Sequence, residues 1–164
     1  MDINRLCKMQ KALDDSIEKA RDLQNEDLIA RKCLAFCVEL GELANETRCF
    51  KFWSDKEASD RETILEEYVD GVHFLLSIGL ELNLDAGKQE VNMEGTAEID
   101  RTAAFIQVYQ AMTDLQRSYT PQAYQGLFDA YWQLGASLGF TDRDVERAYD
   151  EKNEVNYQRQ KDGY

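Results

Sequence analysis

The stretch VELGELANE, residues 38–46, decides the fold class that we predict, because its acidic and its apolar residues both follow a helical period. Its three glutamates, spaced i, i+3 and i+7, lie within about 60° of one another around a helix axis; they are Glu39, Glu42 and Glu46. Leucines occupy the adjoining arc. We therefore predict a helix over residues 27–49 whose acidic stripe borders the protein core.

Apolar residues recur every three or four positions through most of the chain, which has one proline and nine glycines among 164 residues. This pattern favours long helices over short strands. We expect further helices over residues 3–24, 61–82, 98–119, 121–138 and 141–161. Residues that suit N-capping precede three of them: Asp60, Thr120 and Thr141. A stretch without periodicity, residues 84–95, predicts a loop. The sequence thus predicts an all-α fold, a single domain over residues 1–164 built as a bundle of about six helices.

The chain carries 19 basic and 32 acidic residues, for a net charge of −13. Such a field repels nucleic acid and anionic membranes, so we expect neither as a partner. No apolar run approaches the roughly 18 residues that a membrane span needs, and the N-terminus lacks an apolar leader segment, which predicts a cytoplasmic protein. A small phosphorylated substrate remains compatible with this charge, because divalent cations invert the local field.

Four cysteines are present, and two of them, Cys33 and Cys37, lie one helical turn apart among apolar residues. We interpret these two as core thiols. Zinc ligands are the alternative, but the chain has only one histidine to complete a Cys/His site.

A second acidic stripe occurs in EEYVDGVHF, residues 66–74, where Glu67 and Asp70 are again three positions apart beside apolar residues. Carboxylates that face one another near a core repel, which forces either protonation or cation binding. A cluster of oxygens alone favours Mg²⁺ or Mn²⁺. Chance is the alternative, since acidic residues are abundant and Glu151 and Glu154 form the same spacing without an evident role.

The C-terminal segment groups cations and amides in an otherwise acidic chain. Lys152, Asn156 and Arg159 are spaced i, i+4 and i+7 and share one helical face. Their donors suit a polyphosphate, but cations at a helix C-terminus have the same pattern. Similarly, the aromatic segment around Trp53 either stacks on a base or plugs the end of the bundle.

Taken together, these residues resemble the dimeric, all-helical dUTPase family, which is related to the MazG-like nucleotide pyrophosphatases. The similarity covers nearly the whole chain. Its motifs are Glu39-x-x-Glu42, Glu67-x-x-Asp70 followed by His73 and Phe74, Trp53 and Lys56 between these pairs, Gln10 with the LDDSI that follows, and a C-terminal KNxxNxxRQxxGY from Lys152 to Tyr164. The chain is short for this family, so we expect it to lack the inserted helices of larger members, together with any part that these helices play in the dimer.

The resemblance implies hydrolysis of dUTP, and of dUDP as a further substrate, to dUMP by a homodimer that uses Mg²⁺. It implies Mg²⁺ at Glu39, Glu42, Glu67 and Asp70, with Glu39 and Glu42 catalytic and Glu39 taking the proton of the attacking water. It implies that Lys56, Lys152, Asn156, Arg159 and Tyr164 bind the phosphates. It implies that Gln10, Trp53, His73 and Phe74 bind uracil, although His73 also fits a metal ligand or a surface histidine.

Two other functions fit the same residues. A MazG-like pyrophosphatase that acts on another nucleotide, such as dCTP, would use the same acidic stripes. A non-catalytic, acidic helical interaction protein would bind no Mg²⁺ there and would leave the core-bordering position of both acid pairs unexplained.

Overall fold

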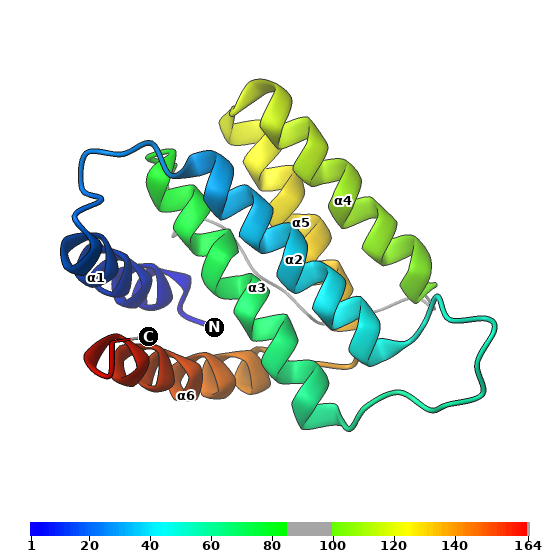
Figure 1. The fold of residues 1–164 in the computed structure, drawn as a ribbon. Helices are drawn as coiled ribbons and strands as arrows, with labels where there is room; N and C mark the ends of the chain where they lie inside the picture. Colours follow the sequence, from blue (N-terminus) through cyan, green and yellow to red (C-terminus); the bar gives the residue numbers. More distant parts are fainter. Residues whose placement is uncertain (85–99, 164) are drawn as a thin grey trace.

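The computed structural model describes residues 1–84 and 100–163 as an all-α bundle, with no strand in these two ranges (Figure 1). This confirms the predicted fold class. The helices are α1 (Ile3–Arg21), α2 (Ile29–Thr47), α3 (Arg61–Glu81), α4 (Arg101–Ser118), α5 (Pro121–Ser137) and α6 (Asp142–Lys161). None of these helices is long and apolar enough to cross a membrane.

Helix α3 is the central element of the bundle, because it packs against α1, α2, α5 and α6 (Figure 1). Its buried residues cover most of its circumference, as expected for a helix enclosed by others. Two glycines allow tyrosines of α5 to approach its backbone: a Cβ atom at Gly71 would overlap Tyr131, and one at Gly79 would overlap Tyr124. The Tyr131 hydroxyl donates to the Tyr68 carbonyl oxygen at 2.7 Å, so these polar groups are satisfied in the core.

The helix starts follow the capping residues that the sequence predicted. The side chains of Asp60, Thr120 and Thr141 each accept a hydrogen bond from a backbone N–H of the first turn. Thr141 also forms a capping box with Asp144, which satisfies donors at both positions.

Three predicted helix boundaries were too wide. The first helix ends at Arg21 instead of residue 24, because Asp22 adopts a left-handed conformation with a φ of 58°. The second ends at Thr47, where Arg48 does the same with a φ of 56°. The fourth begins at Arg101, after Asp100 caps it. The predicted loop over 84–95 lies, apart from Leu84, outside the described residues.

The cysteine interpretation is confirmed for Cys33, which is fully buried in the core. Burial raises the pKa of its thiol to about 11. Cys37 is only partly buried at the core edge, and all four cysteines are free thiols.

Candidate active site

Three carboxylates from two helices meet at one point of the bundle. Glu39 on α2 and Glu67 and Asp70 on α3 each offer an oxygen, and these oxygens all lie within 4.8 Å of one another. Helix α2 packs antiparallel against α3 (Figure 1), and this packing brings Glu39 close to Glu67 and Asp70. We call these three residues the acidic cluster. Glu42 is exposed at its rim.

The pKa values of the acidic cluster are raised because the groups are partly buried and repel one another. Burial, followed by the charges of Asp70, Glu42 and Glu67, raises the pKa of Glu39 to about 7. Burial and neighbouring carboxylates also raise the pKa of Glu67. For Asp70, burial raises the pKa while the hydrogen bond from Lys152 opposes it. A cation would relieve the repulsion at this point.

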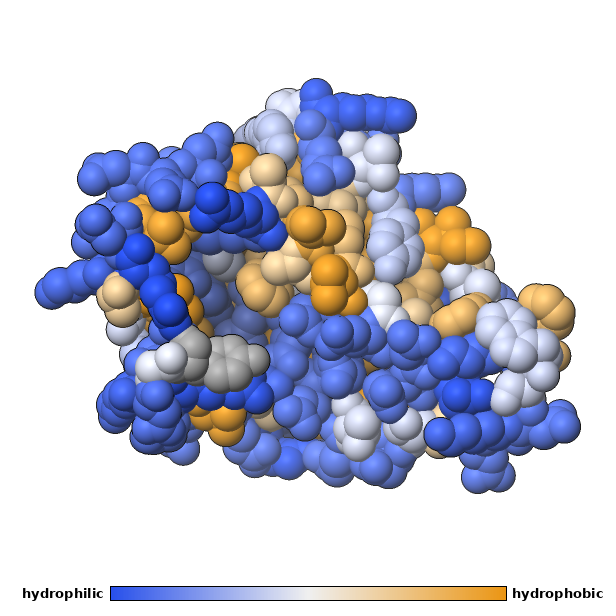
Figure 2. All heavy atoms as spheres, in the orientation of Figure 1, coloured by the Kyte–Doolittle hydropathy of each residue, from blue (hydrophilic) through white to orange (hydrophobic). Residues whose placement is uncertain are grey.

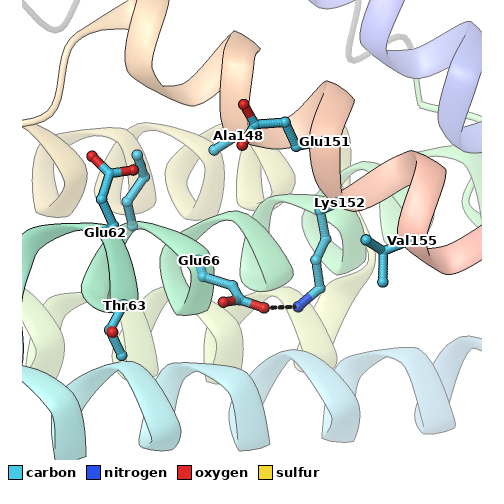
Figure 3. Close-up of a pocket in the computed structure, with 8 residues that line it drawn as sticks. Glu62, Thr63, Glu66, Ala148, Glu151, Lys152 and Val155 are labelled. Carbon is cyan, nitrogen blue, oxygen red and sulfur yellow. Dashed lines mark hydrogen bonds and ion pairs between the residues drawn. The ribbon is translucent and has the colours of Figure 1, made fainter.

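One ammonium group already contacts the acidic cluster. Lys152 on α6 places its Nζ atom 2.7 Å from Asp70 Oδ2 and 2.8 Å from Glu66 Oε1. Figure 3 shows the Lys152 side chain reaching from α6 across to Glu66 on α3. Only 10% of the Lys152 side chain is exposed, so it is a partly buried cation at the edge of the cluster.

A cavity of about 310 Å³ adjoins the acidic cluster, and Glu39 and Asp70 form part of its wall. Residues of α1, α3 and α6 complete the lining: Gln10, Leu13, Asp14, Ile17, His73, Phe74, Asn156, Arg159 and Gln160. The cavity therefore brings together three residues predicted to bind the base and two predicted to bind phosphates.

Polar hydrogen bonds organise the inner end of this cavity. Gln10 Oε1 lies 2.8 Å from His73 Nδ1 and accepts a hydrogen bond of 2.7 Å from the Tyr149 hydroxyl. The His73 ring also stacks on Tyr149, with ring centroids 4.0 Å apart. Burial, with a further effect of Lys152, lowers the pKa of His73 to about 3, so its imidazole is neutral. His73 is only 5% exposed, so it is not a surface histidine.

Two predicted site residues lie away from the cavity. Trp53 and Lys56 belong to the connection between α2 and α3, and neither lines the cavity wall. Trp53 is 65% exposed and Phe52 is 94% exposed, so these aromatic rings do not plug the end of the bundle. Tyr164 lies outside the described residues.

Several residues that shape the site were not among the predicted site residues. Asp14 accepts a 2.7 Å hydrogen bond from Gln10 Nε2, and Glu66 shares Lys152 with Asp70. Asp14 follows Gln10 by one helical turn, a spacing that was visible in the sequence. Tyr149 and Glu66 left no such signal, because their partners lie on other helices.

Clustered carboxylates beside a cavity lined by amide, imidazole and guanidinium groups are an arrangement that could hold a small phosphorylated ligand through a divalent cation. The family model described as dUTPase matches residues 2–164, so the chain belongs to the all-α dUTPase family. It is a dUTP diphosphatase, a hydrolase whose substrate is a nucleotide. No curated protein matches the chain.

Proposed function

We propose that the chain hydrolyses dUTP to dUMP and pyrophosphate with Mg²⁺ held by Glu39, Glu42, Glu67 and Asp70. The acidic cluster carries this proposal, because three carboxylate oxygens within 4.8 Å of one another lie beside the cavity that contains Gln10, His73 and Arg159. dUDP, which has the same base and sugar, is proposed as a second substrate.

The residues present fit Mg²⁺ or Mn²⁺. The acidic cluster offers oxygens only, which hard divalent cations prefer. The raised pKa values of Glu39, Glu67 and Asp70 indicate charge that is incompletely compensated, even with Lys152 nearby. Bound Mg²⁺ would supply charge neutralisation for the triphosphate and Lewis acidity at the reacting phosphorus.

Glu39 is the proposed general base. It belongs to the acidic cluster and lines the cavity, and a pKa of about 7 in the metal-free protein reflects its burial and acidic neighbours. A carboxylate in this position takes a proton from the attacking water as the bond to phosphorus forms. Glu42, at the rim, is proposed to complete the metal site.

The phosphates are proposed to lie toward α6. Asn156 and Arg159 line the cavity one turn apart, so an amide and a guanidinium face the same space as Glu39. Charge-assisted hydrogen bonds from such donors stabilise the negative charge that develops on the leaving pyrophosphate. Lys152 adds an ammonium at the cluster, and Lys56 and Tyr164 stay predictions from the family motif.

Uracil is proposed to occupy the inner end of the cavity. Gln10, His73 and Phe74 combine hydrogen-bonding groups with an aromatic ring in the cavity wall, and Gln10 and His73 are buried there. Trp53 is exposed on the connection between α2 and α3, and its contact with the base stays a prediction from the motif.

A homodimer is also proposed. Apolar side chains gather along α2 and α4 on the face shown in Figure 2. Leu34 is 66% exposed and Val38 48% exposed on α2, and Ile106 is 52% exposed on α4. Tyr109 joins the two helices there, because its hydroxyl donates to the Cys37 carbonyl oxygen at 3.4 Å. Burial of this face against a second copy of the chain would remove apolar surface from water.

A cytoplasmic location, without nucleic acid or membrane partners, stays a prediction from the sequence.

The test is pyrophosphate release from dUTP, dTTP, dCTP and UTP, and phosphate release from dUDP, each with Mg²⁺ and with EDTA. We expect turnover of dUTP with Mg²⁺ and loss of turnover in EDTA. Preferred turnover of dCTP would support the alternative pyrophosphatase. Unchanged turnover of dUTP in EDTA would contradict the metal site.

A further inference from the structure

A chain of polar contacts connects the inner end of the cavity, where we propose that uracil binds, to the charged side chains of Asp14 and Lys32. Asp14 on α1 accepts a hydrogen bond of 2.7 Å from Gln10 Nε2 through Oδ1 and one of 2.6 Å from the Ser77 hydroxyl through Oδ2. Lys32 Nζ lies 3.6 Å from the same Oδ2 atom. On the other side, Gln10 Oε1 contacts His73 and Tyr149.

The donors around Asp14 determine which way the Gln10 amide points. The Lys32 ammonium group carries only donors, and the Ser77 hydroxyl donates its hydrogen to the Asp14 carboxylate. Both neighbours therefore favour Asp14 as a hydrogen-bond acceptor. Burial raises the pKa of Asp14, whereas the Ser77 hydrogen bond and the Lys32 charge lower it and favour the carboxylate. A carboxylate 2.7 Å away would repel the amide oxygen of Gln10, so the Gln10 NH₂ group must face Asp14.

The orientation of Gln10 in turn determines where His73 carries its proton. With Nε2 of Gln10 on Asp14, only Oε1 remains to face His73 Nδ1 at 2.8 Å. An oxygen acceptor requires that Nδ1 carry the hydrogen of the neutral ring. The other ring nitrogen, Nε2, is then a hydrogen-bond acceptor.

His73 Nε2 is buried and has no hydrogen-bond partner among residues 1–84 and 100–163. The His73 side chain lines the cavity, and only 5% of the residue is exposed. A buried acceptor without a partner costs stability, and a ligand that donates a hydrogen bond to it recovers that cost.

We propose that Asp14 is a positioning residue for base recognition: through Gln10 it fixes His73 as the Nδ1–H tautomer, so that Nε2 selects a base with an imide N–H. Uracil carries a hydrogen on N3 and can donate it, whereas cytosine has an unprotonated N3 that would face Nε2 lone pair to lone pair. The identity of the ligand rests on the proposed function, but the tautomer does not.

Asp14→Asn separates this role from simple packing, because the two side chains have the same shape. Lys32 and Ser77 keep an oxygen on their side of the substituted residue, so its NH₂ group faces Gln10. Gln10 must then turn its own oxygen toward that group and its NH₂ toward His73. The substitution is therefore expected to move the His73 hydrogen from Nδ1 to Nε2.

The chain has one histidine, so its imidazole nitrogens give a single set of NMR signals after ¹⁵N-histidine labelling. In the unliganded wild-type protein at neutral pH we expect a protonated Nδ1 and an unprotonated Nε2, and dUMP should shift the Nε2 resonance. In Asp14→Asn we expect the reverse, with Nε2 of His73 protonated and Nδ1 unprotonated. Two variants should keep the wild-type pattern: Ser77→Ala, which retains the carboxylate, and Asp15→Asn, which removes an exposed charge paired with Lys11.

Steady-state kinetics tests the link to base selection. Asp14→Asn should lower kcat/KM for dUTP relative to dCTP by about tenfold to a hundredfold. In this variant the Nε2–H group of His73 would face the N3–H group of uracil, so that two donors meet. Asp15→Asn should leave this ratio unchanged. If the chain hydrolyses neither nucleotide, the proposed function fails, whereas the tautomer is still measured.

Two results would overturn the positioning role. The first is an Nε2–H tautomer of His73 in the wild-type protein. This measurement needs no variant, so it tests the positioning role even if Asp14→Asn does not fold. The second is a folded Asp14→Asn variant that keeps both the Nδ1–H tautomer and the wild-type ratio of dUTP to dCTP turnover.

Discussion

Replacement of Glu39 by glutamine is expected to inactivate the protein while stabilising its metal-free form. Glu39 lies in the acidic cluster with Glu67 and Asp70, and its pKa of about 7 shows that its negative charge is unfavourable in the folded state. Glutamine keeps the shape and removes the charge. It also removes the group that we propose as general base, so kcat/KM for dUTP should fall by about 10²–10⁴.

The pKa of Glu39 sets the size of the stability effect. A rise from 4.5 to about 7 corresponds to roughly 3 kcal/mol of destabilisation when the group is fully ionised. Because water reaches this partly exposed carboxylate, we reduce the expected gain to about 1–2 kcal/mol. For a chain of this length that is a rise in Tm of roughly 2–8 °C.

The difference in stability between Glu39→Gln and the wild-type protein depends on pH, because the charge of Glu39 does. A carboxyl with a raised folded-state pKa contributes stability that is fully present below the unfolded value of 4.5 and is lost as the pH rises through about 7. In EDTA, Glu39→Gln should therefore melt above wild type at pH 8 and close to it at pH 5. Glu154→Gln, which removes the same charge from an exposed position on α6, is the control. A Glu39→Gln variant that melts below wild type at pH 8 would refute the reasoning.

Three further predictions follow from the site and the surface. Millimolar Mg²⁺ should raise the Tm of wild type, and more so with a non-hydrolysable dUTP analogue, since ligands of the native state stabilise it; an unchanged melting curve would favour the interaction protein. Arg159→Ala should lower kcat/KM for dUTP at least about 10²-fold with little change in Mg²⁺ binding. If Arg159 only complements the C-terminus of α6, the substitution would lower the free energy of unfolding by at most about 1 kcal/mol and leave turnover intact. Light scattering should give a dimer mass, and Leu34→Asp with Val38→Asp should give a monomer; a monomeric wild type at micromolar concentration would exclude the dimer.

The fold was predictable because helices leave local signals. N-capping side chains at Asp60, Thr120 and Thr141 precede periodic apolar segments, and both signals lie within a few residues of each other. The helix ends were less accurate, since Asp22 and Arg48 adopt left-handed conformations that glycine or asparagine more often marks in a sequence.

The spacing of acidic residues along the sequence predicted which of them share a helix face, but not which groups of other helices lie opposite them. The spacing of Glu67 and Asp70 placed them on one face, and the position of Glu39 beside core residues indicated that it would meet them. No periodicity indicates which group of another helix lies opposite. The contacts of Tyr149 with Gln10 and of Lys152 with Asp70 join residues 139 and 82 positions apart, so they appear only in the folded chain.

Lys152 illustrates how electrostatics modifies a role that helical spacing suggests. The sequence places it on one face with Asn156 and Arg159, and both of these line the cavity. Lys152 instead contacts Asp70 and Glu66, because an ammonium near a cluster of partly buried carboxylates lowers their mutual repulsion. A divalent cation at the acidic cluster would compete for the same Asp70 oxygen and reduce the attraction that holds Lys152 there. The ammonium that offsets the repulsion within the acidic cluster would thus be the one that a bound cation makes available to phosphates.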